Sequence, residues 1–181
     1  MDAAIEVLAR EGARGLTFRS VDVEAAVPPG TASNYFASRD DLLTRAGSRV
    51  YERLQPDDAT MARHRTSAPD RHTYVVLMRE LIARIGAFRT GHLALLELRL
   101  EATRRPELRA VLTGRVRADI DANANVAYHL ASGLPGDATA VRLLYLAFNW
   151  IVVEQLTLPD VFSEAERDAL VAAAVERIVT P

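Results

Sequence analysis

The sequence predicts an all-α protein of about nine helices in two domains. Apolar residues recur at every third or fourth position along most of the 181 residues, which is the spacing of one helix face. No β-branched segment alternates apolar and polar residues as a half-buried strand does. Breaks rich in glycine, proline and aspartate separate a first domain at 1–55, a joint at 56–69 and a second domain at 70–181.

Four helices are predicted in the first domain. They are expected at about 2–11, from Thr17 to Pro28, at 29–36 and from Ser38 to Pro56. Gly12 ends the first helix, and Thr17 is a typical N-cap for the second. Pro29 fits the first turn of the third helix, where a missing N–H does no harm. Ser38 and Asp41 resemble a capping box at the start of the fourth.

Five longer helices are predicted in the second domain. They are expected at about 71–89, 92–103, 106–132, 137–157 and 163–179, with breaks that include Thr90–Gly91 and Gly133–Gly136. Ser163 and Glu166 have the spacing of a capping box, and Gly133 stands where a glycine commonly ends a helix. Five helices of this length can pack as a bundle.

The composition is that of a folded chain without a broad charge bias. The hydrophobic fraction is 49%, and the net charge is −2. All 22 basic residues are arginine, which is typical of a GC-rich genome. Cysteine is absent, so neither disulfides nor thiolate metal sites can form. The apolar stretches fall short of the roughly 20 residues that span a membrane. Asp2 and Glu6 stand where a signal peptide carries positive charge, and we therefore expect a cytoplasmic location.

The second and third helices have the layout of a helix-turn-helix, in which two short helices are braced by a helix on each side. The third helix offers polar, short side chains that can reach base edges, with close approach allowed by two small residues. The hydrogen-bonding residues are Thr31, Ser33, Asn34 and Tyr35, and the small ones are Gly30 and Ala32. Free N–H groups at its start are expected to attract phosphate. Phe36 is better placed as an anchor in the core.

The run from Ala3 to Leu43 resembles the DNA-binding domain of the tetracycline-repressor (TetR) family. The positions that match the family pattern are Gly12, Thr17, Gly30, Thr31, Tyr35, Phe36, Ser38, Arg39, Asp40 and Leu42. Ala26 departs from the pattern, since the family usually has glycine there, and Ser33 stands where an aromatic residue often touches phosphate. Family members usually carry further residues ahead of the first helix. Either the natural chain extends before Met1, or this protein makes fewer phosphate contacts.

The resemblance implies a DNA contact for nine residues. Phosphate contacts are implied for Thr17, Arg19, Ser20, Tyr35 and Arg39, contacts with base edges for Thr31, Ser33 and Asn34, and close approach at Gly30. The first 55 residues contain seven arginines and eight carboxylates. We therefore expect the domain to bind DNA through a few placed contacts and not through a broad basic surface.

The resemblance also implies that the second domain binds a small effector and dimerises through its last two long helices. Residues 140–153 are apolar nearly all round, which suggests cover from the same domain on one face and from a partner on the other. The alternative is a buried central helix in a monomer. The candidate ligand residues are His92, Tyr128, Tyr145, Asn149 and Trp150, with Glu97, Arg99, Glu101 and Asn123 also considered. Tyr145 and Asn149 share one helix face and are favoured.

Two other classes of function are alternatives to a regulator. The four histidines show no HExxH or Glu-x-x-His spacing, and no phosphate loop or nucleophile elbow occurs, so we expect no enzyme, cofactor or metal. Glu97 and Glu101 are interpreted as a solvated face. A helical interaction module that has lost DNA binding remains an alternative. The favoured function is a repressor that binds a palindromic double-stranded operator as a homodimer, is released by a small-molecule effector and has no membrane partner.

Overall fold

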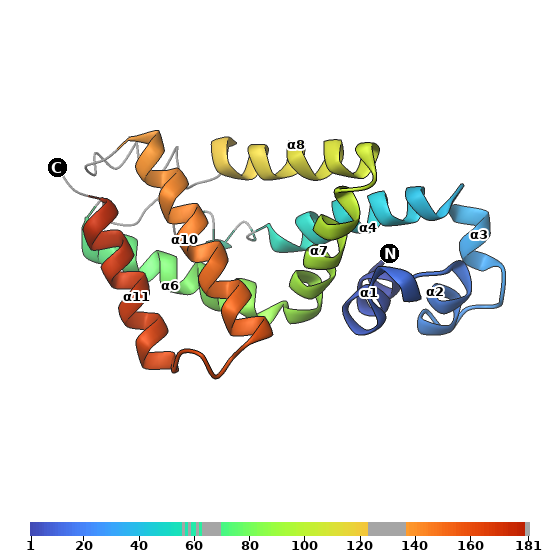
Figure 1. The fold of residues 1–181 in the computed structure, drawn as a ribbon, viewed down its shortest axis with the longest axis horizontal. Helices are drawn as coiled ribbons and strands as arrows, with labels where there is room; N and C mark the ends of the chain where they lie inside the picture. Colours follow the sequence, from blue (N-terminus) through green and yellow to red (C-terminus); the bar gives the residue numbers. More distant parts are fainter. Residues whose placement is uncertain (56, 58, 61, 63–69, 123–136, 180–181) are drawn as a thin grey trace. The chain divides into compact units, whose positions relative to one another are not determined.

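The computed structural model describes residues 1–55, 57, 59, 60, 62, 70–122 and 137–179 (Figure 1). Within these residues the chain forms α-helices and no strands, which confirms the predicted all-α class. The helices are α1 (Asp2–Gly15), α2 (Phe18–Glu24), α3 (Thr31–Tyr35), α4 (Arg39–Leu54), α6 (Arg71–Ala87), α7 (Arg89–Ala102), α8 (Pro106–Ala122), α10 (Ala138–Thr157) and α11 (Glu164–Ile178). Gly133, expected to end a helix, lies outside the described residues. Among the described helices none is long and apolar enough to cross a membrane.

The helices group into two compact units that are not continuous in sequence. The first combines Met1–Gln55 with Phe88–Val116, so α7 and the first part of α8 belong with α1 to α4. The second combines the described parts of 56–87 and 117–181, which include α6, α10 and α11. The predicted division at 1–55, 56–69 and 70–181 follows the sequence and stays a prediction.

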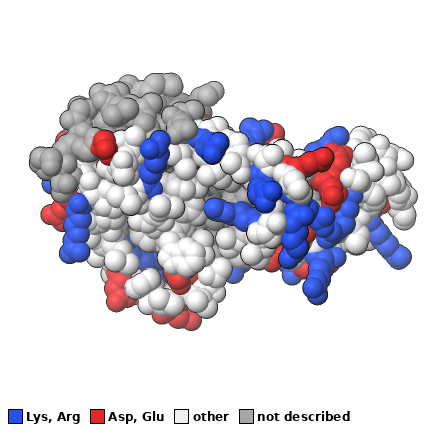
Figure 2. All heavy atoms as spheres, turned by 45° about the horizontal axis from the view of Figure 1, so that its top comes forward, with Lys and Arg blue, Asp and Glu red and all other residues white. Residues whose placement is uncertain are grey.

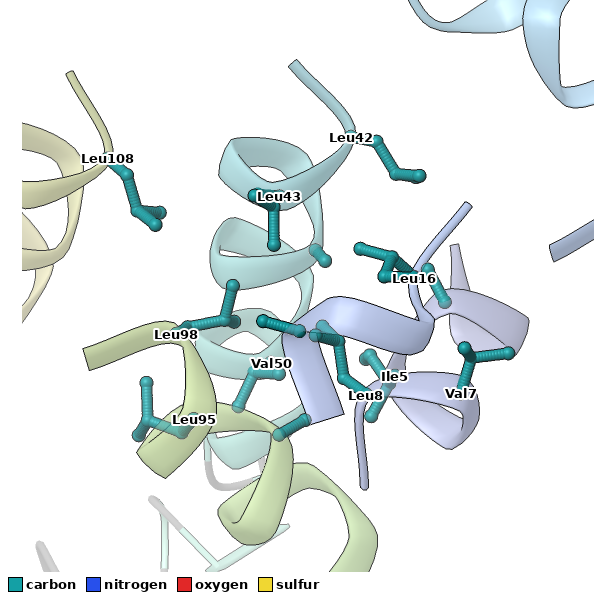
Figure 3. Close-up of a cluster of buried hydrophobic side chains, with 14 of the residues drawn as sticks. Ile5, Val7, Leu8, Leu16, Leu42, Leu43, Val50, Leu95, Leu98 and Leu108 are labelled. Carbon is teal, nitrogen blue, oxygen red and sulfur yellow. The ribbon is translucent and has the colours of Figure 1, made fainter. Parts of the chain in front are cut away.

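The core of the first unit is made by α1, α4 and α7 together (Figure 3). Its fully buried side chains include Ile5, Leu8, Leu42, Leu43, Val50 and Leu98. Burying one such side chain stabilises the fold by about 1.5–3 kcal/mol. Because α7 supplies part of this core, the helices α1 and α4 that flank the helix-turn-helix are packed on a helix that comes much later in the chain.

A break at Gly12 divides α1, as the glycine in the sequence predicted. Gly12 takes φ +68° and ψ −177°, a conformation that L side chains rarely adopt. The break frees the N–H of Ala13, which donates to Oε2 of Glu97 at 3.0 Å. A second polar contact joins the same helices, since Thr90 Oγ1 donates to Glu6 Oε1 at 3.0 Å. Two polar contacts therefore fix α7 on α1.

The interpretation of Glu97 and Glu101 as a solvated face is wrong. Glu97 is half-buried against α1, and Glu101 is buried and accepts hydrogen bonds from Arg104 and Arg105. Burial by itself raises the pKa of Glu101, but the two guanidinium groups outweigh it and the pKa is lowered. The spacing of the two glutamates suggested an exposed face, but α7 packs within the first unit, so this polar face contacts other helices.

The predicted break at Thr90–Gly91 is also wrong, because both residues lie inside α7. The chain passes from α6 to α7 through Phe88 alone. Gly91 makes room for the Phe88 ring, since a Cβ on Gly91 would lie 2.1 Å from Phe88 Cε1. This glycine therefore permits close packing and does not end a helix.

In the second unit, α6, α10 and α11 pack against one another. Asp137 caps α10 by accepting from the N–H groups of Thr139 and Ala140 at 2.8 and 3.1 Å. The predicted capping box of α11 is confirmed: Ser163 accepts from the N–H of Glu166, whose carboxylate accepts from the N–H of Ser163.

Candidate nucleic-acid interface

The start of α2 is closed by a capping box between Thr17 and Ser20. Thr17 Oγ1 accepts from the N–H of Ser20 at 3.0 Å, and Ser20 Oγ accepts from the N–H of Thr17 at 2.9 Å. The predicted N-cap is thus confirmed, but with Ser20 as its partner. The Ser20 hydroxyl also donates to the carbonyl of Gly15 at 2.8 Å. Thr17 is exposed, whereas the Ser20 hydroxyl is held by the protein itself.

The end of α2 is a Schellman motif built without glycine. The N–H of Val27 donates to the carbonyl of Asp22 at 3.0 Å, and the N–H of Ala26 donates to the carbonyl of Val23 at 3.1 Å. Ala26 accordingly takes φ +52° in the left-handed region. The turn therefore forms with alanine at the position where the resembled family has glycine, at a cost of about 1–2 kcal/mol.

The third helix is shorter than predicted. It spans Thr31–Tyr35 and not 29–36, because Gly30 takes φ +91° and a left-handed residue cannot continue a right-handed helix. Pro28 and Pro29 consequently form the turn, with the N–H of Thr31 donating to the carbonyl of Pro28 at 3.1 Å. The turn residues are exposed.

The N-terminus of α3 is capped by a residue that sequence reasoning missed. Asp22, only 2% exposed, accepts from the N–H groups of Gly30 and Ala32, each at 2.7 Å and each with a different carboxylate oxygen. These N–H groups, which were expected to attract phosphate, are therefore already bonded to a carboxylate of the protein itself. The signal in the sequence is slight: Asp22 lies between two valines in a short helix.

The exposed side of α3 presents Ser33, Asn34 and Tyr35, the last 70% exposed. The hydroxyl of Ser33 donates to the carbonyl of Gly30 at 2.8 Å, and that of Thr31 to the carbonyl of Pro28 at 2.6 Å. Both oxygens keep the capacity to accept a bond from a base or a water. Within the described chain no partner is recorded for the side chains of Asn34 and Tyr35, so both are available to a ligand.

Phe36 ends α3 and anchors it, as predicted. Its half-buried ring packs against the core of the first unit, and the Arg45 guanidinium lies 5.6 Å from the ring centroid. Ser38 caps α4 by accepting from the N–H of Asp41 at 3.1 Å. The Asp41 carboxylate does not accept from the N–H of Ser38, as a full capping box requires, but from the N–H of Ala37. This hydrogen bond lowers the pKa of Asp41.

Most arginines of the first 55 residues have partners inside the first unit. Arg39 donates to the carbonyls of Leu16 and Ala13, so its guanidinium holds the end of α1. The remaining pairs are Arg10 with Glu11 and Glu24, Arg45 with Asp41, Arg49 with Asp2 and Glu52, and Arg53 with Asp2. These bonds use Nε and Nη2, so a phosphate contact by Arg39 would come from the remaining N–H groups of a guanidinium that α1 already holds in place.

Arg14 and Arg19 are the two arginines of this region that are exposed and for which the described residues provide no ion pair. They flank the connection between α1 and α2, next to the exposed Thr17. On the face that Figure 2 draws, blue and red side chains lie side by side. The charge available to DNA is thus local, as the sequence indicated, although Arg14 was not singled out.

The candidate ligand residues are divided between the two units. His92 belongs to the first unit, is 7% exposed, and its Nδ1 has no hydrogen-bond partner in the described structure. Tyr145 and Asn149 are half-buried, one turn apart on α10 in the second unit, and Trp150 beside them is exposed. Tyr128 and Asn123 lie outside the described residues. No described group of three His, Asp or Glu side chains has the arrangement of a metal site.

One face of α10 is buried within the chain, and the other is open. Val141, Leu144 and Phe148 are buried. On the other side the exposed apolar residues are Leu143, Leu146 and Trp150, spaced three and four apart. We call these three residues the α10 stripe. Among the described residues, the apolar pattern of α10 therefore exceeds what the chain covers.

Sequence models of two families match nearly the whole chain. Residues 1–46 match the family described as bacterial regulatory proteins, tetR family, and residues 69–181 match the tetracyclin repressor-like C-terminal domain. A curated relative is an uncharacterised HTH-type transcriptional regulator in the dhlA 5′ region of Xanthobacter autotrophicus. It is 35% identical over 85 residues, which are 45% of this chain and 41% of the relative. The match thus spans about two fifths of the relative's length.

Solved structures resemble the whole chain. The multidrug binding protein EbrR, complexed with imidazole, is 30% identical with a TM-score of 0.68, over 99% of this chain and 92% of that one. A TetR-family member from Streptomyces coelicolor A3 is 29% identical with a TM-score of 0.69, over 99% and 95%. A transcriptional regulator from Rhodococcus sp. Rha1 shares the fold, with a TM-score of 0.76 at 16% identity over 99% and 96%.

Proposed function

The chain belongs to the TetR family of bacterial regulatory proteins, and on this premise we propose that it is a cytoplasmic, non-enzymatic transcriptional repressor. It binds a palindromic operator as a homodimer and is released by a small-molecule effector. The observation that carries the proposal is the exposed side of α3, where polar side chains stand on a helix whose N-terminus and C-terminus are both held by the protein.

In the proposed complex α3 lies in the major groove. Asn34 and the acceptor oxygens of Thr31 and Ser33 meet base edges, with Gly30 allowing the backbone to come close. Tyr35, Thr17 and Arg19 contact phosphates. Arg14 joins this set on the ground that it is exposed and unpaired within the described structure. Ser20 and Arg39, which are engaged with the protein, hold the interface in shape and are the weaker members of the implied set.

The proposed dimer places two copies of α3 in successive turns of the major groove. Half-sites of a palindrome are roughly 34–36 Å apart, and a two-fold dimer matches that symmetry. The α10 stripe supports an interface on α10, because a row of large apolar side chains in water favours association. A partner's α10 and α11 are the proposed cover.

The proposed effector is a small organic molecule held by the second domain. Support comes from EbrR, which binds imidazole in one solved structure and ethidium in another that is 28% identical to this chain with a TM-score of 0.69. Tyr145 and Asn149 are the favoured contacts, and Trp150 and Tyr128 complete the proposed set. Effector binding is proposed to displace α4 and with it the recognition helix. Because α7 shares a core with α4, the two are expected to move together.

Selection from a pool of randomised DNA duplexes tests the proposal. A repressor of this kind enriches a palindrome, and its affinity for that duplex falls steeply as salt rises. Ethidium, proflavin and imidazole are then added to the complex as effector probes. Release by a probe that also binds the protein in the absence of DNA supports the effector step, and the second condition is needed because ethidium and proflavin intercalate into duplex DNA. Binding of a probe with unchanged operator affinity contradicts that step. A protein that enriches no sequence and binds no duplex at low salt is the interaction module that the alternative describes.

Two substitutions on α3 separate base reading from positioning. Asn34→Ala is expected to change which bases are enriched, with a loss of about 1–3 kcal/mol on the preferred duplex. Tyr35→Ala is expected to weaken binding to the preferred and to a random duplex alike. Equal losses on both duplexes for both variants would contradict the assigned roles.

A further inference from the structure

We propose that Asp22 determines the base preference of this regulator without touching DNA, by fixing the orientation of α3. This inference rests on the proposed function, and it adds a positioning residue that belongs to α2. The carboxylate lies beneath the recognition helix, 2% exposed, and both of its oxygens are used on the backbone of the segment that α3 begins in.

The recognition helix has little else to hold it. It is five residues long, far below the length at which a helix is stable by itself. Its N-cap is Gly30, which has no side chain to offer the free N–H groups. Ala32 is its one buried residue, and a methyl group restrains rotation weakly. Phe36 anchors the C-terminal end. The orientation of the N-terminal end, where base edges are read, therefore depends on Asp22.

Asp22 spans the whole turn between α2 and α3. Its main-chain carbonyl accepts from the N–H of Val27, and its carboxylate accepts from Gly30 and Ala32. Asp22 thus holds three backbone N–H groups within the six residues from Val27 to Ala32. Hydrogen bonds to an ionised carboxylate are roughly twice as strong as neutral ones, and loss of the buried acceptor leaves two N–H groups without a partner. The negative charge also faces the positive end of the α3 dipole.

A loosened α3 has a specific consequence for DNA binding. Base readout depends on hydrogen bonds that tolerate little displacement, whereas phosphate contacts position the protein and carry no sequence information. Of the proposed phosphate contacts, Thr17 and Arg19 lie toward the start of α2 and take no part in the bonds that Asp22 makes, whereas Tyr35 lies at the C-terminal end of α3, which Phe36 anchors. Loss of the carboxylate is therefore expected to reduce discrimination between duplexes while binding to random DNA persists.

The experiment compares Asp22→Ala and Asp22→Asn with the wild-type protein. Each is measured against the duplex that the wild type enriches and against a random duplex of equal length at the same salt. Glu97→Gln is the matched control, because it also removes a carboxylate that accepts from a backbone N–H in the first unit, but at α1 and not at α3. Circular dichroism establishes that each variant is folded at the temperature used, and amide hydrogen exchange follows the N–H groups of Gly30 and Ala32.

For Asp22→Ala we expect the ratio of the two affinities to fall about tenfold, the size of one mismatched base pair. Asp22→Asn keeps the side-chain shape but accepts only one of the two bonds, so it should retain part of the ratio and remains informative if Asp22→Ala does not fold. Both should speed exchange at Gly30 and Ala32, and Glu97→Gln should leave the ratio unchanged. Equal losses on both duplexes overturn the inference. A wild type that enriches no duplex overturns the proposed function itself, and the inference with it.

Discussion

At the scale of single residues, Ala26 carries a backbone cost that the sequence indicated. Its φ of +52° is reached readily by glycine but not by alanine. Ala26→Gly should stabilise the protein by about 0.5–1 kcal/mol, since relief of roughly 1–2 kcal/mol is partly offset by the greater entropy of glycine in the unfolded chain. Thermal unfolding should therefore shift upward by about 2 °C. Ala25→Gly is the control, because Ala25 has φ −79° and the same change there should destabilise.

His92 should make stability depend on pH. Burial, with help from the positive charge of Arg99, lowers the pKa of His92 to about 4, against 6.5 for an exposed histidine. Between pH 4 and pH 6.5 the unfolded state binds a proton at this histidine that the folded state does not bind. The contribution of neutral His92 to the free energy of unfolding is therefore fully present above about pH 6.5 and is lost as the pH falls toward 4. Urea unfolding at pH 7 and pH 4.5 should show a loss that is about 2 kcal/mol smaller in His92→Leu than in the wild type. Equal losses would place His92 in contact with water.

At the scale of elements, α3 shows how a helix can be specified by its neighbours. The sequence of this segment predicts a longer helix than the structure has, because Pro29 is a good first-turn residue and Phe36 continues the apolar pattern. The structure limits it at both ends, with left-handed Gly30 before it and extended Phe36 after it. The capping carboxylate comes from α2. A helix this short is thus a part of the helix-turn-helix and has no independent stability.

The start of α2 should provide the salt-dependent part of DNA binding. Arg19→Ala removes an exposed arginine without an ion pair in the described structure, whereas Arg10→Ala removes one that already pairs with Glu11 and Glu24. Arg19→Ala should lower the slope of log affinity against log salt by about 1, and Arg10→Ala should leave it nearly unchanged. Binding isotherms on the enriched duplex at several salt concentrations provide the comparison. A larger effect for Arg10 would exclude the proposed phosphate contact.

At the scale of the whole molecule, the α10 stripe predicts self-association. Leu146→Asp should weaken the dimer by at least about tenfold for each copy, because burial of a leucine contributes about 1.5–3 kcal/mol. Leu100→Asp is the matched control, since Leu100 on α7 is 61% exposed and Leu146 is 62% exposed. Sedimentation equilibrium over a micromolar range measures both. A wild type that is monomeric throughout, or equal effects of the two changes, would contradict the proposed interface.

The sequence was sufficient where the information is local. Thr17, Ser38 and Ser163 were identified as caps because an N-cap is decided within four residues. It failed where the information comes from distant parts of the chain. Glu101 resembled a solvated residue because nothing in its own helix shows that the fold of the first unit buries it. Gly91 resembled a helix stop because the Phe88 ring it accommodates is a tertiary contact.

The candidate DNA interface was predicted in its residues but not in their states. The pattern identified Thr31, Ser33, Asn34 and Tyr35 as the reading face, and the structure leaves them facing outward to different degrees. That Arg39 is held by carbonyls, while Arg14 is without an ion pair in the described structure, depends on which helix ends meet. Charge counts give the total of positive and negative groups, but pairing depends on distances that only the fold provides.

The sequence by itself determined the all-α fold, the family resemblance and the helix-turn-helix. Helix periodicity, caps and a motif of some 40 residues each depend on residues that are close together in the sequence. The tertiary structure decided what supports that motif. It packed α7 into the core of the first unit and placed the buried Asp22 carboxylate under the recognition helix. Burial and backbone hydrogen bonding between helices arise only when the chain is folded, and they are the interactions that orient the reading face.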